Sequence, residues 1–159
     1  MFLARCLKWA VLIFVMLPLG VNSQTCSGSL GDPIVQITFG RGSNFGPALP
    51  SGTTSSIQYV ASQCPNDGYY SIVSSTSGCF GGNWQTVKDH TGNGNGYFML
   101  VNASYEPSNF FVRKIEGLCP GTTYEFAAWL MNVLATSGIH PNITFTIEKE
   151  NGEVLKSFD

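Results

Sequence analysis

Charged residues are scarce in this chain. Asp, Glu, Lys and Arg make up 11% of the 159 residues, whereas soluble domains average about 25%. Lys and Arg together number 8 against 10 acidic residues, and no run of basic residues occurs. The chain therefore lacks the positive surface with which proteins bind nucleic-acid phosphates, and we expect no nucleic-acid partner.

Motifs of common catalytic and metal sites are missing as well. The sequence contains no Cys-x-x-Cys, His-Glu-x-x-His or Gly-x-Ser-x-Gly motif, each of which would position a metal ligand or a nucleophile. His90 and His140 are the two histidines, and neither lies in such a motif. We therefore predict that the chain is not an enzyme.

The first residues are typical of a secretory signal peptide. Arg5 and Lys8 precede an apolar run of 13 residues from Trp9 to Val21, which is shorter than the ~20 residues of a membrane-spanning helix. Val21 and Ser23 fit the −3 and −1 positions of a cleavage site. We expect a signal peptide over residues 1–23, a secreted or cell-surface protein, and no membrane insertion after cleavage. The alternative is an uncleaved N-terminal anchor.

Disulfides are expected in an exported chain. Of the 5 cysteines, Cys6 would leave with the signal peptide, so that Cys26, Cys64, Cys79 and Cys119 remain. An even number in such a chain indicates disulfide bonds, although four cysteines allow three connectivities. We predict a Cys64–Cys79 disulfide around a short loop. Cys26 would pair with Cys119 or with a cysteine beyond this chain.

Apolar and polar residues alternate with a period of two in several segments, as is typical of β-strands. Turn-forming Gly (18) and Pro (8) separate the apolar runs. Residues 122–134 permit either a strand or a helix, and we favour a strand because aromatic residues recur at alternate positions. The strands are expected at residues 34–39, 70–74, 96–103, 110–115, 122–134, 142–149 and 153–158. The chain is therefore predicted to be all-β.

The last two predicted strands form a hairpin. Asn151-Gly152 lies between them, and this dipeptide favours a two-residue type I′ turn because both central residues need positive φ. Residues 24–159 have the size of one domain. The final strand has no following neighbour in this sequence. We therefore expect the chain to be the front part of a longer protein.

The order of motifs from Trp84 to Val133 resembles a known family. Trp84 is followed by Asp89-His90-Thr91, a Gly-rich loop, an apolar strand from Gly96, then Cys119 and a long aromatic segment. This order is similar to the middle of MAM-type and carbohydrate-binding-module-type jelly rolls.

Residues 26–158 also resemble modules near the front of large bacterial surface proteins with gliding-motility-type C-terminal sorting domains. The resemblance implies an extracellular, non-catalytic jelly-roll β-sandwich that is incomplete at its C-terminal end. Such modules bind glycans or mediate adhesion.

The Gly-rich loop is a candidate cation site. Asp89 and Asn93 carry the oxygen ligands that Ca²⁺ prefers, and glycine lets backbone carbonyl groups turn towards an ion. The alternative is a hydrogen-bonded turn network in which Asp89 and Thr91 bind local amides. A structural Ca²⁺ is therefore one of two expectations for this loop.

Aromatic side chains are the candidate ligand contacts. Sugars have apolar ring faces and polar rims, which match aromatic rings beside amide side chains. We predict ligand contacts at Trp84, Tyr69, Tyr105 and Asn95. The alternative is that the aromatic residues are core or strand-covering, which we expect of Phe126 and Trp129. The predicted partner is a glycan or another cell-surface protein. The alternatives are a purely structural module of a surface fibre and an ancillary domain of a secreted polysaccharide hydrolase.

Overall fold

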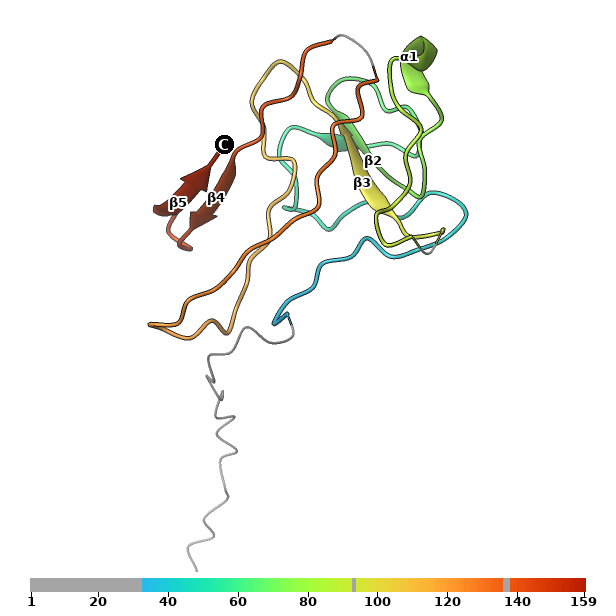
Figure 1. Cartoon of the computed structure of the whole chain (residues 1–159). Helices are drawn as coiled ribbons and strands as arrows, with labels where there is room; N and C mark the ends of the chain where they lie inside the picture. Colours follow the sequence, from blue (N-terminus) through green and yellow to red (C-terminus); the bar gives the residue numbers. More distant parts are fainter. Residues whose placement is uncertain (1–32, 93, 136–137) are drawn as a thin grey trace, which may run out of the picture.

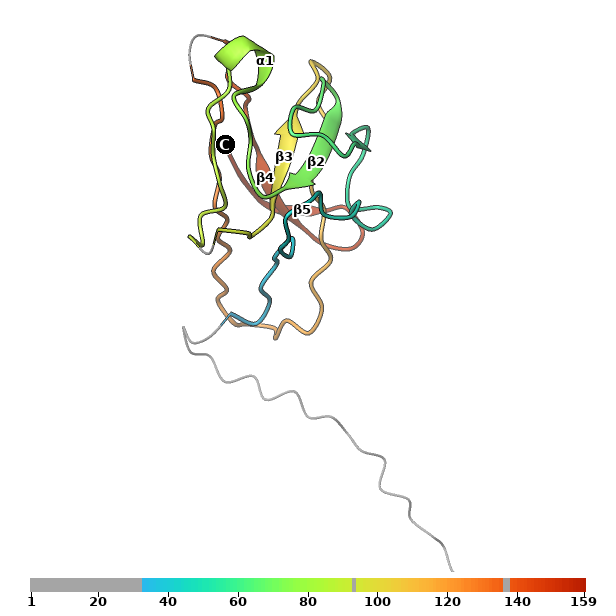
Figure 2. The same cartoon turned by 90° about the vertical axis from the view of Figure 1, so that its right-hand side faces the viewer.

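The computed structural model describes residues 33–92, 94–135 and 138–159 (Figures 1 and 2). Within these residues the chain is rich in strands, which form two small sheets, and it has almost no helix. This agrees with the β-rich prediction. In the described part, no helix is long and apolar enough to span a membrane. The predicted signal peptide, Cys26 and Asn93 lie outside the described residues.

The central sheet holds the core of the molecule. It contains β1 (Gln58–Tyr59), β2 (Tyr69–Val73) and β3 (Phe98–Asn102) in the order β1-β2-β3. β1 runs parallel to β2, whereas β2 and β3 are antiparallel. β2 overlaps the strand predicted at residues 70–74, and β3 lies within the one predicted at residues 96–103. β1 was not predicted.

Both faces of this sheet are covered by buried side chains. Successive residues of a strand point to opposite faces, so Tyr70 and Ile72 pack in one cluster with Ile57. Val73 and Leu100 pack in the other cluster. Ile72 is 1% exposed, and full burial of such a side chain contributes about 1.5–3 kcal/mol. Leu100 of β3 is therefore buried, and the other apolar residues of this strand are partly buried against the two clusters.

The second sheet is a hairpin of β4 (Phe145–Glu148) and β5 (Val154–Phe158). It lies apart from the central sheet in Figure 1. No Cα atom of β4 or β5 comes within 8 Å of a Cα atom of β1, β2 or β3. The hairpin was predicted from its sequence, and its strands pair antiparallel as expected.

The turn of this hairpin differs from the predicted type I′ turn. The N–H of Gly152 donates to the carbonyl of Lys149, so the central residues of the turn are Glu150 and Asn151. Positive φ occurs at Gly152 (85°) and not at Asn151. A turn followed by a left-handed glycine is the three-residue loop with a G1 bulge. It needs one residue with positive φ instead of two, and glycine adopts that conformation without steric cost.

Three predicted strands do not form. Residues 34–39, 110–115 and 122–134 contain no strand in the described structure, and 122–134 contains no helix either. The last of these segments makes one isolated bridge, between Leu134 and Trp84. An alternating pattern permits an extended chain, but a strand also needs a hydrogen-bonded neighbour. These three segments form no regular ladder of backbone hydrogen bonds, so the prediction of strands there is wrong.

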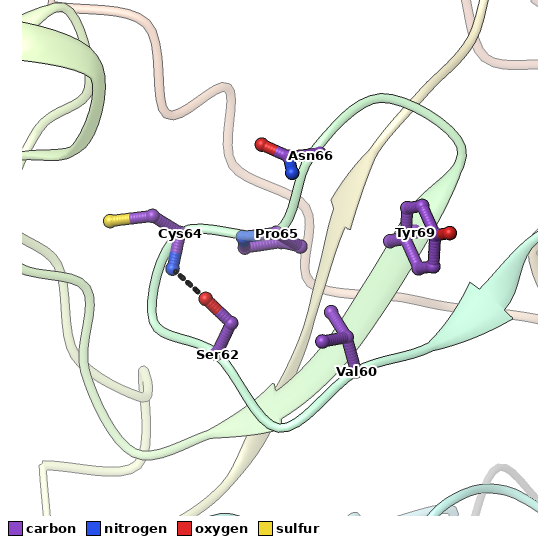
Figure 3. A pocket seen from close by; sticks show the side chains of 6 residues that line it. All are labelled: Val60, Ser62, Cys64, Pro65, Asn66 and Tyr69. Carbon is purple, nitrogen blue, oxygen red and sulfur yellow. Dashed lines mark hydrogen bonds between the residues drawn. The ribbon is translucent and has the colours of Figure 1, made fainter.

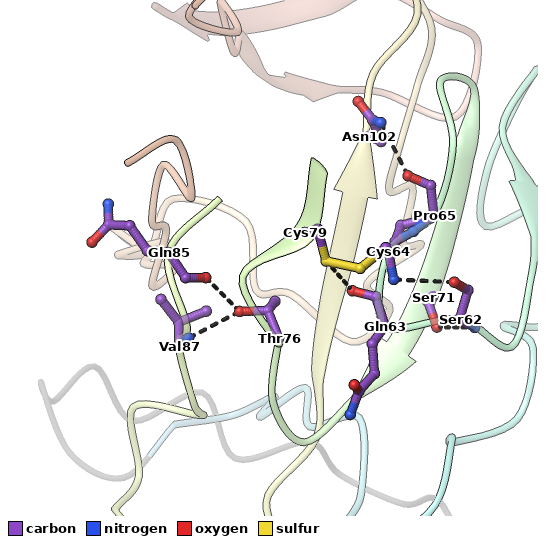
Figure 4. The surroundings of a disulfide bond; sticks show 10 residues. All are labelled: Ser62, Gln63, Cys64, Pro65, Ser71, Thr76, Cys79, Gln85, Val87 and Asn102. Atoms are coloured by element: carbon purple, nitrogen blue, oxygen red, sulfur yellow. Dashed lines mark hydrogen bonds between the residues drawn. A yellow bond between two sulfur atoms is a disulfide. The ribbon is translucent and has the colours of Figure 1, made fainter. Parts of the chain in front are cut away.

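The predicted disulfide joins Cys64 to Cys79, with their Cα atoms 5.4 Å apart (Figure 4). Cys79 begins α1 (Cys79–Gly82), a short turn in which Phe80 (φ 54°) and Gly81 (φ 70°) are left-handed. Cys119 is also disulfide-bonded, and its partner lies outside the described residues. The disulfide thus holds this left-handed turn against the loop that precedes β2.

Candidate functional site

An exposed tryptophan of the described chain rests on a histidine from a distant loop. Trp129 is 80% exposed, and one face of its indole stacks on the imidazole of His90. The ring centroids are 4.8 Å apart and the ring planes differ by 23°. Trp129 is thus not the core or strand-covering residue that we expected. Phe126, for which we expected the same, is 54% exposed.

The histidine beneath Trp129 is held by its neighbours in the loop. An oxygen of the Asp89 carboxylate lies 3.3 Å from Nδ1 of His90. The other oxygen accepts hydrogen bonds from the backbone N–H of Thr91, at 3.2 Å, and from the Thr91 hydroxyl. The Asp89 side chain is 11% exposed and that of His90 is 48% exposed. The loop therefore presents His90 to solvent on a largely covered carboxylate.

The environment of Asp89 keeps its carboxylate ionised. Burial by itself would raise its pKa, but hydrogen bonds from Thr91 and the proximity of His90 outweigh burial and lower the pKa. An acid with a lowered pKa is a poor proton donor near neutral pH. Asp89 is thus suited to orienting His90 rather than to proton transfer.

The hydrogen bonds of Asp89 and Thr91 are those of the predicted turn network. Residues 33–92, 94–135 and 138–159 contain no group of three His, Cys, Asp or Glu side chains arranged for a metal. Ca²⁺ also uses backbone and amide oxygens, and Asn93 lies outside the described residues. The calcium site at Asp89 and Asn93 stays a prediction.

Trp84 does not have the exposed position that we expected of a ligand contact. It is 8% exposed and packs in the core with Val73, Cys79 and Leu100. Its ring also meets that of Phe80 edge to face, with centroids 4.9 Å apart. The Gly-rich surroundings suggested exposure, but the adjacent disulfide and left-handed turn fold this segment onto the core. The indole is therefore unavailable as a flat platform.

The other three predicted ligand residues lie in different settings. Tyr105 is 87% exposed and Asn95 is exposed. Tyr69 is half-buried at one wall of a shallow cavity of about 80 Å³ beside the disulfide (Figure 3). Tyr105 and Asn95 do not line this cavity. The cavity walls are formed by Val60, Ser62, Cys64, Pro65, Asn66 and Tyr69.

The exposure of Trp129 had no sequence signal. Within residues 122–134, Trp129 alternates with Phe126 and Leu130, but both of these are 54% exposed as well. The alternation therefore does not separate exposed from buried side chains in this segment. The stack on His90 had no local signal either, because it joins residues 39 positions apart.

No protein-family model, curated protein or solved structure matches this chain. The resemblance to MAM-type and carbohydrate-binding-module-type jelly rolls therefore depends on the sequence motifs from Trp84 to Val133 alone.

Proposed function

We propose that this chain is a non-catalytic extracellular module that binds glycans through Trp129 and His90. The observation that carries the proposal is the exposed indole stacked on a supported imidazole. The C–H face of a pyranose ring is apolar, and an exposed indole offers a complementary flat surface. One face of Trp129 rests on His90, which leaves the opposite face for a sugar ring.

The contact of Trp129 with His90 reduces the entropic cost of binding a ligand. A side chain that must be ordered on binding loses rotamer entropy, about 0.5–1.5 kcal/mol for a flexible one. His90 limits the motion of Trp129, and Asp89 and Thr91 hold His90. The indole is therefore oriented before a ligand arrives.

Location and architecture form part of the proposal. We propose a jelly-roll β-sandwich that is secreted or displayed at the cell surface. The β-rich fold supports the architecture. The Cys64–Cys79 disulfide supports an oxidising compartment, because such bonds are rare in the cytosol. The signal-like sequence of residues 1–23 points the same way.

A second candidate function is a protein-adhesive or structural module of a surface fibre. One observation favours it, the exposure of Phe145 (39%) and Phe158 (49%), which are paired across the β4–β5 hairpin. Exposed apolar side chains that lie together mark interaction sites, protein contacts among them. An ancillary domain of a polysaccharide hydrolase would use the same glycan site as the leading proposal.

A glycan array with the whole secreted chain tests the leading proposal. We expect binding to at least one polysaccharide, and a loss of about tenfold in affinity for Trp129→Ala, equivalent to about 1.4 kcal/mol. Phe126→Ala is the matched control, because Phe126 is exposed on the same segment and does not stack on His90. Unchanged binding by Trp129→Ala, or an array without any bound glycan, would contradict the proposal.

A further inference from the structure

The shallow cavity beside the disulfide of Cys64 has walls that are held in place by covalent and hydrogen bonds (Figure 3). The N–H of Tyr69 donates to the carbonyl of Asn66 at 3.0 Å. The side-chain amide of Asn102 donates to the carbonyl of Pro65, also at 3.0 Å. A wall that is already ordered loses little conformational entropy on binding, so this cavity is suited to hold a ligand group.

The size of the cavity limits which group it can accept. Its volume is about 80 Å³, whereas one water molecule needs roughly 10–15 Å³ and drug-sized ligands occupy cavities of about 300–1,000 Å³. The cavity therefore accepts a group of a few non-hydrogen atoms, such as one substituent of a sugar, while the sugar ring itself stays outside.

The lining of the cavity combines apolar surface with an amide. Val60, Pro65 and Tyr69 contribute apolar groups. Asn66 also lines the cavity and is exposed, and no residue that the structure describes hydrogen-bonds to its carboxamide. A carboxamide offers both N–H donors and a carbonyl acceptor. The complementary group therefore has a methyl group for the apolar wall and an amide of its own for Asn66.

We propose that this cavity binds the acetamido group of an N-acetylated amino sugar. The methyl group packs against Val60, Pro65 and Tyr69. The acetamido carbonyl accepts a hydrogen bond from the carboxamide of Asn66, and the acetamido N–H donates one to it. A hydroxyl group has no methyl group, the methyl group of a deoxy sugar has no amide, and a carboxylate has no N–H to donate. The class of ligand rests on the glycan binding proposed above, but Trp129 does not line this cavity.

NMR titration of the full secreted chain with two matched trisaccharides tests this proposal. Triacetylchitotriose and cellotriose have the same ring and the same glycosidic linkage, and each acetamido group of the first is a hydroxyl group in the second. We expect triacetylchitotriose to shift the amide signals of Val60, Asn66 and Tyr69, and cellotriose to leave them in place. Equal shifts with both sugars would overturn the selection of the acetamido group. No shift with either would overturn the site.

Variants of the same loop assign the contact to Asn66. Asn66→Ala should weaken the binding of triacetylchitotriose at the cavity by about tenfold, equivalent to about 1.4 kcal/mol. Asn66→Asp keeps the shape of the side chain but has no N–H to donate, so it should bind as weakly. Gln63→Ala is the matched control, because Gln63 is an exposed amide of this loop that does not line the cavity. Wild-type affinity of both Asn66 variants would overturn the role of Asn66.

Trp129→Ala separates this proposal from the glycan binding proposed above. We expect the variant to keep the shifts of Val60, Asn66 and Tyr69 with triacetylchitotriose, since Trp129 lies outside the cavity. Sugar-induced shifts of the Trp129 indole without shifts at the cavity would reject the acetamido site and leave the proposed function standing. Shifts at the cavity without any at the indole would have the opposite meaning.

Discussion

β2 and β5 are both five-residue strands with an antiparallel neighbour, but their surroundings differ completely. In β2, Ile72 is 1% exposed, whereas Leu155 of β5 is 56% exposed. β2 lies between β1 and β3, and side-chain clusters cover both of its faces. β5 has a neighbour on one side. The comparison shows that an alternating sequence makes a strand possible, while its burial depends on which distant segments fold onto it.

The tryptophans Trp84 and Trp129 also show that exposure does not follow from the local sequence. Trp84 comes from a Gly-rich, polar segment and is 8% exposed, whereas Trp129 comes from an apolar segment and is 80% exposed. Their positions follow from contacts with distant residues, the core around Cys79 for one and His90 for the other. The buried region thus acts as the scaffold. The candidate glycan surface at Trp129 lies on the exposed region.

The sharpest way to test the contrast between β2 and β5 is to truncate one side chain in each. Ile72→Ala should lower the free energy of unfolding by about 2–5 kcal/mol, because it leaves a cavity in a closed core. Leu155→Ala should change it by less than about 0.5 kcal/mol. Denaturant-induced unfolding measures both variants. A loss for Leu155→Ala equal to that for Ile72→Ala would show that β5 is covered in solution.

Removal of the Cys64–Cys79 disulfide should weaken the scaffold by a comparable but somewhat smaller amount. The cysteines are 15 positions apart, and a loop of that size corresponds to about 3 kcal/mol. The double variant Cys64→Ala/Cys79→Ala is compared with the wild type by denaturant-induced unfolding.

The same double variant should leave the exposed β4–β5 hairpin unaffected. No Cα atom of the hairpin strands lies within 8 Å of a Cα atom of the central sheet, so amide exchange of residues 154–158 should not change. Faster exchange there at denaturant concentrations that keep the core folded would show that the two regions are coupled.

The smallest change in stability is expected at the loop of Asp89 and His90, which contacts the exposed Trp129. The folded-state pKa of Asp89 lies below its ordinary value of 3.8. Its carboxylate therefore stabilises the loop above about pH 4, and this stabilisation is lost as the pH falls through the lowered pKa. The effect should be under about 1 kcal/mol.

Trp129 fluorescence during acid titration measures this effect. The wild-type signal should change as Asp89 is protonated, because His90 then loses its charged partner. Asp89→Asn should remove that change, while Glu150→Gln, an exposed acid away from the stack, should retain it. If Asp89→Asn gives the same titration curve as the wild type, Asp89 does not support the stack of Trp129 on His90.

β2, β3, the hairpin and the disulfide could be predicted because each has a local signal. β2 and β4 alternate, β3 lies in a near-continuous apolar run, Asn151-Gly152 marks a turn, and a short loop favours pairing of Cys64 with Cys79. The exact turn could not be predicted, because a type I′ turn and a G1 bulge both accept Asn-Gly. The extended segment 122–134 has the pattern of a strand, but its hydrogen-bonding neighbours are not encoded within it.

By itself, the sequence of this protein determined where the chain can extend, where it turns and which cysteines can close a short loop. These properties depend on residues that are close together in the chain. Tertiary structure alone decided that Trp84 is buried, that Trp129 stacks on His90 and that the side chains of β5 are exposed. Each of these depends on contacts between distant segments, whose free energy comes from removing apolar surface from water and has no local sequence signature.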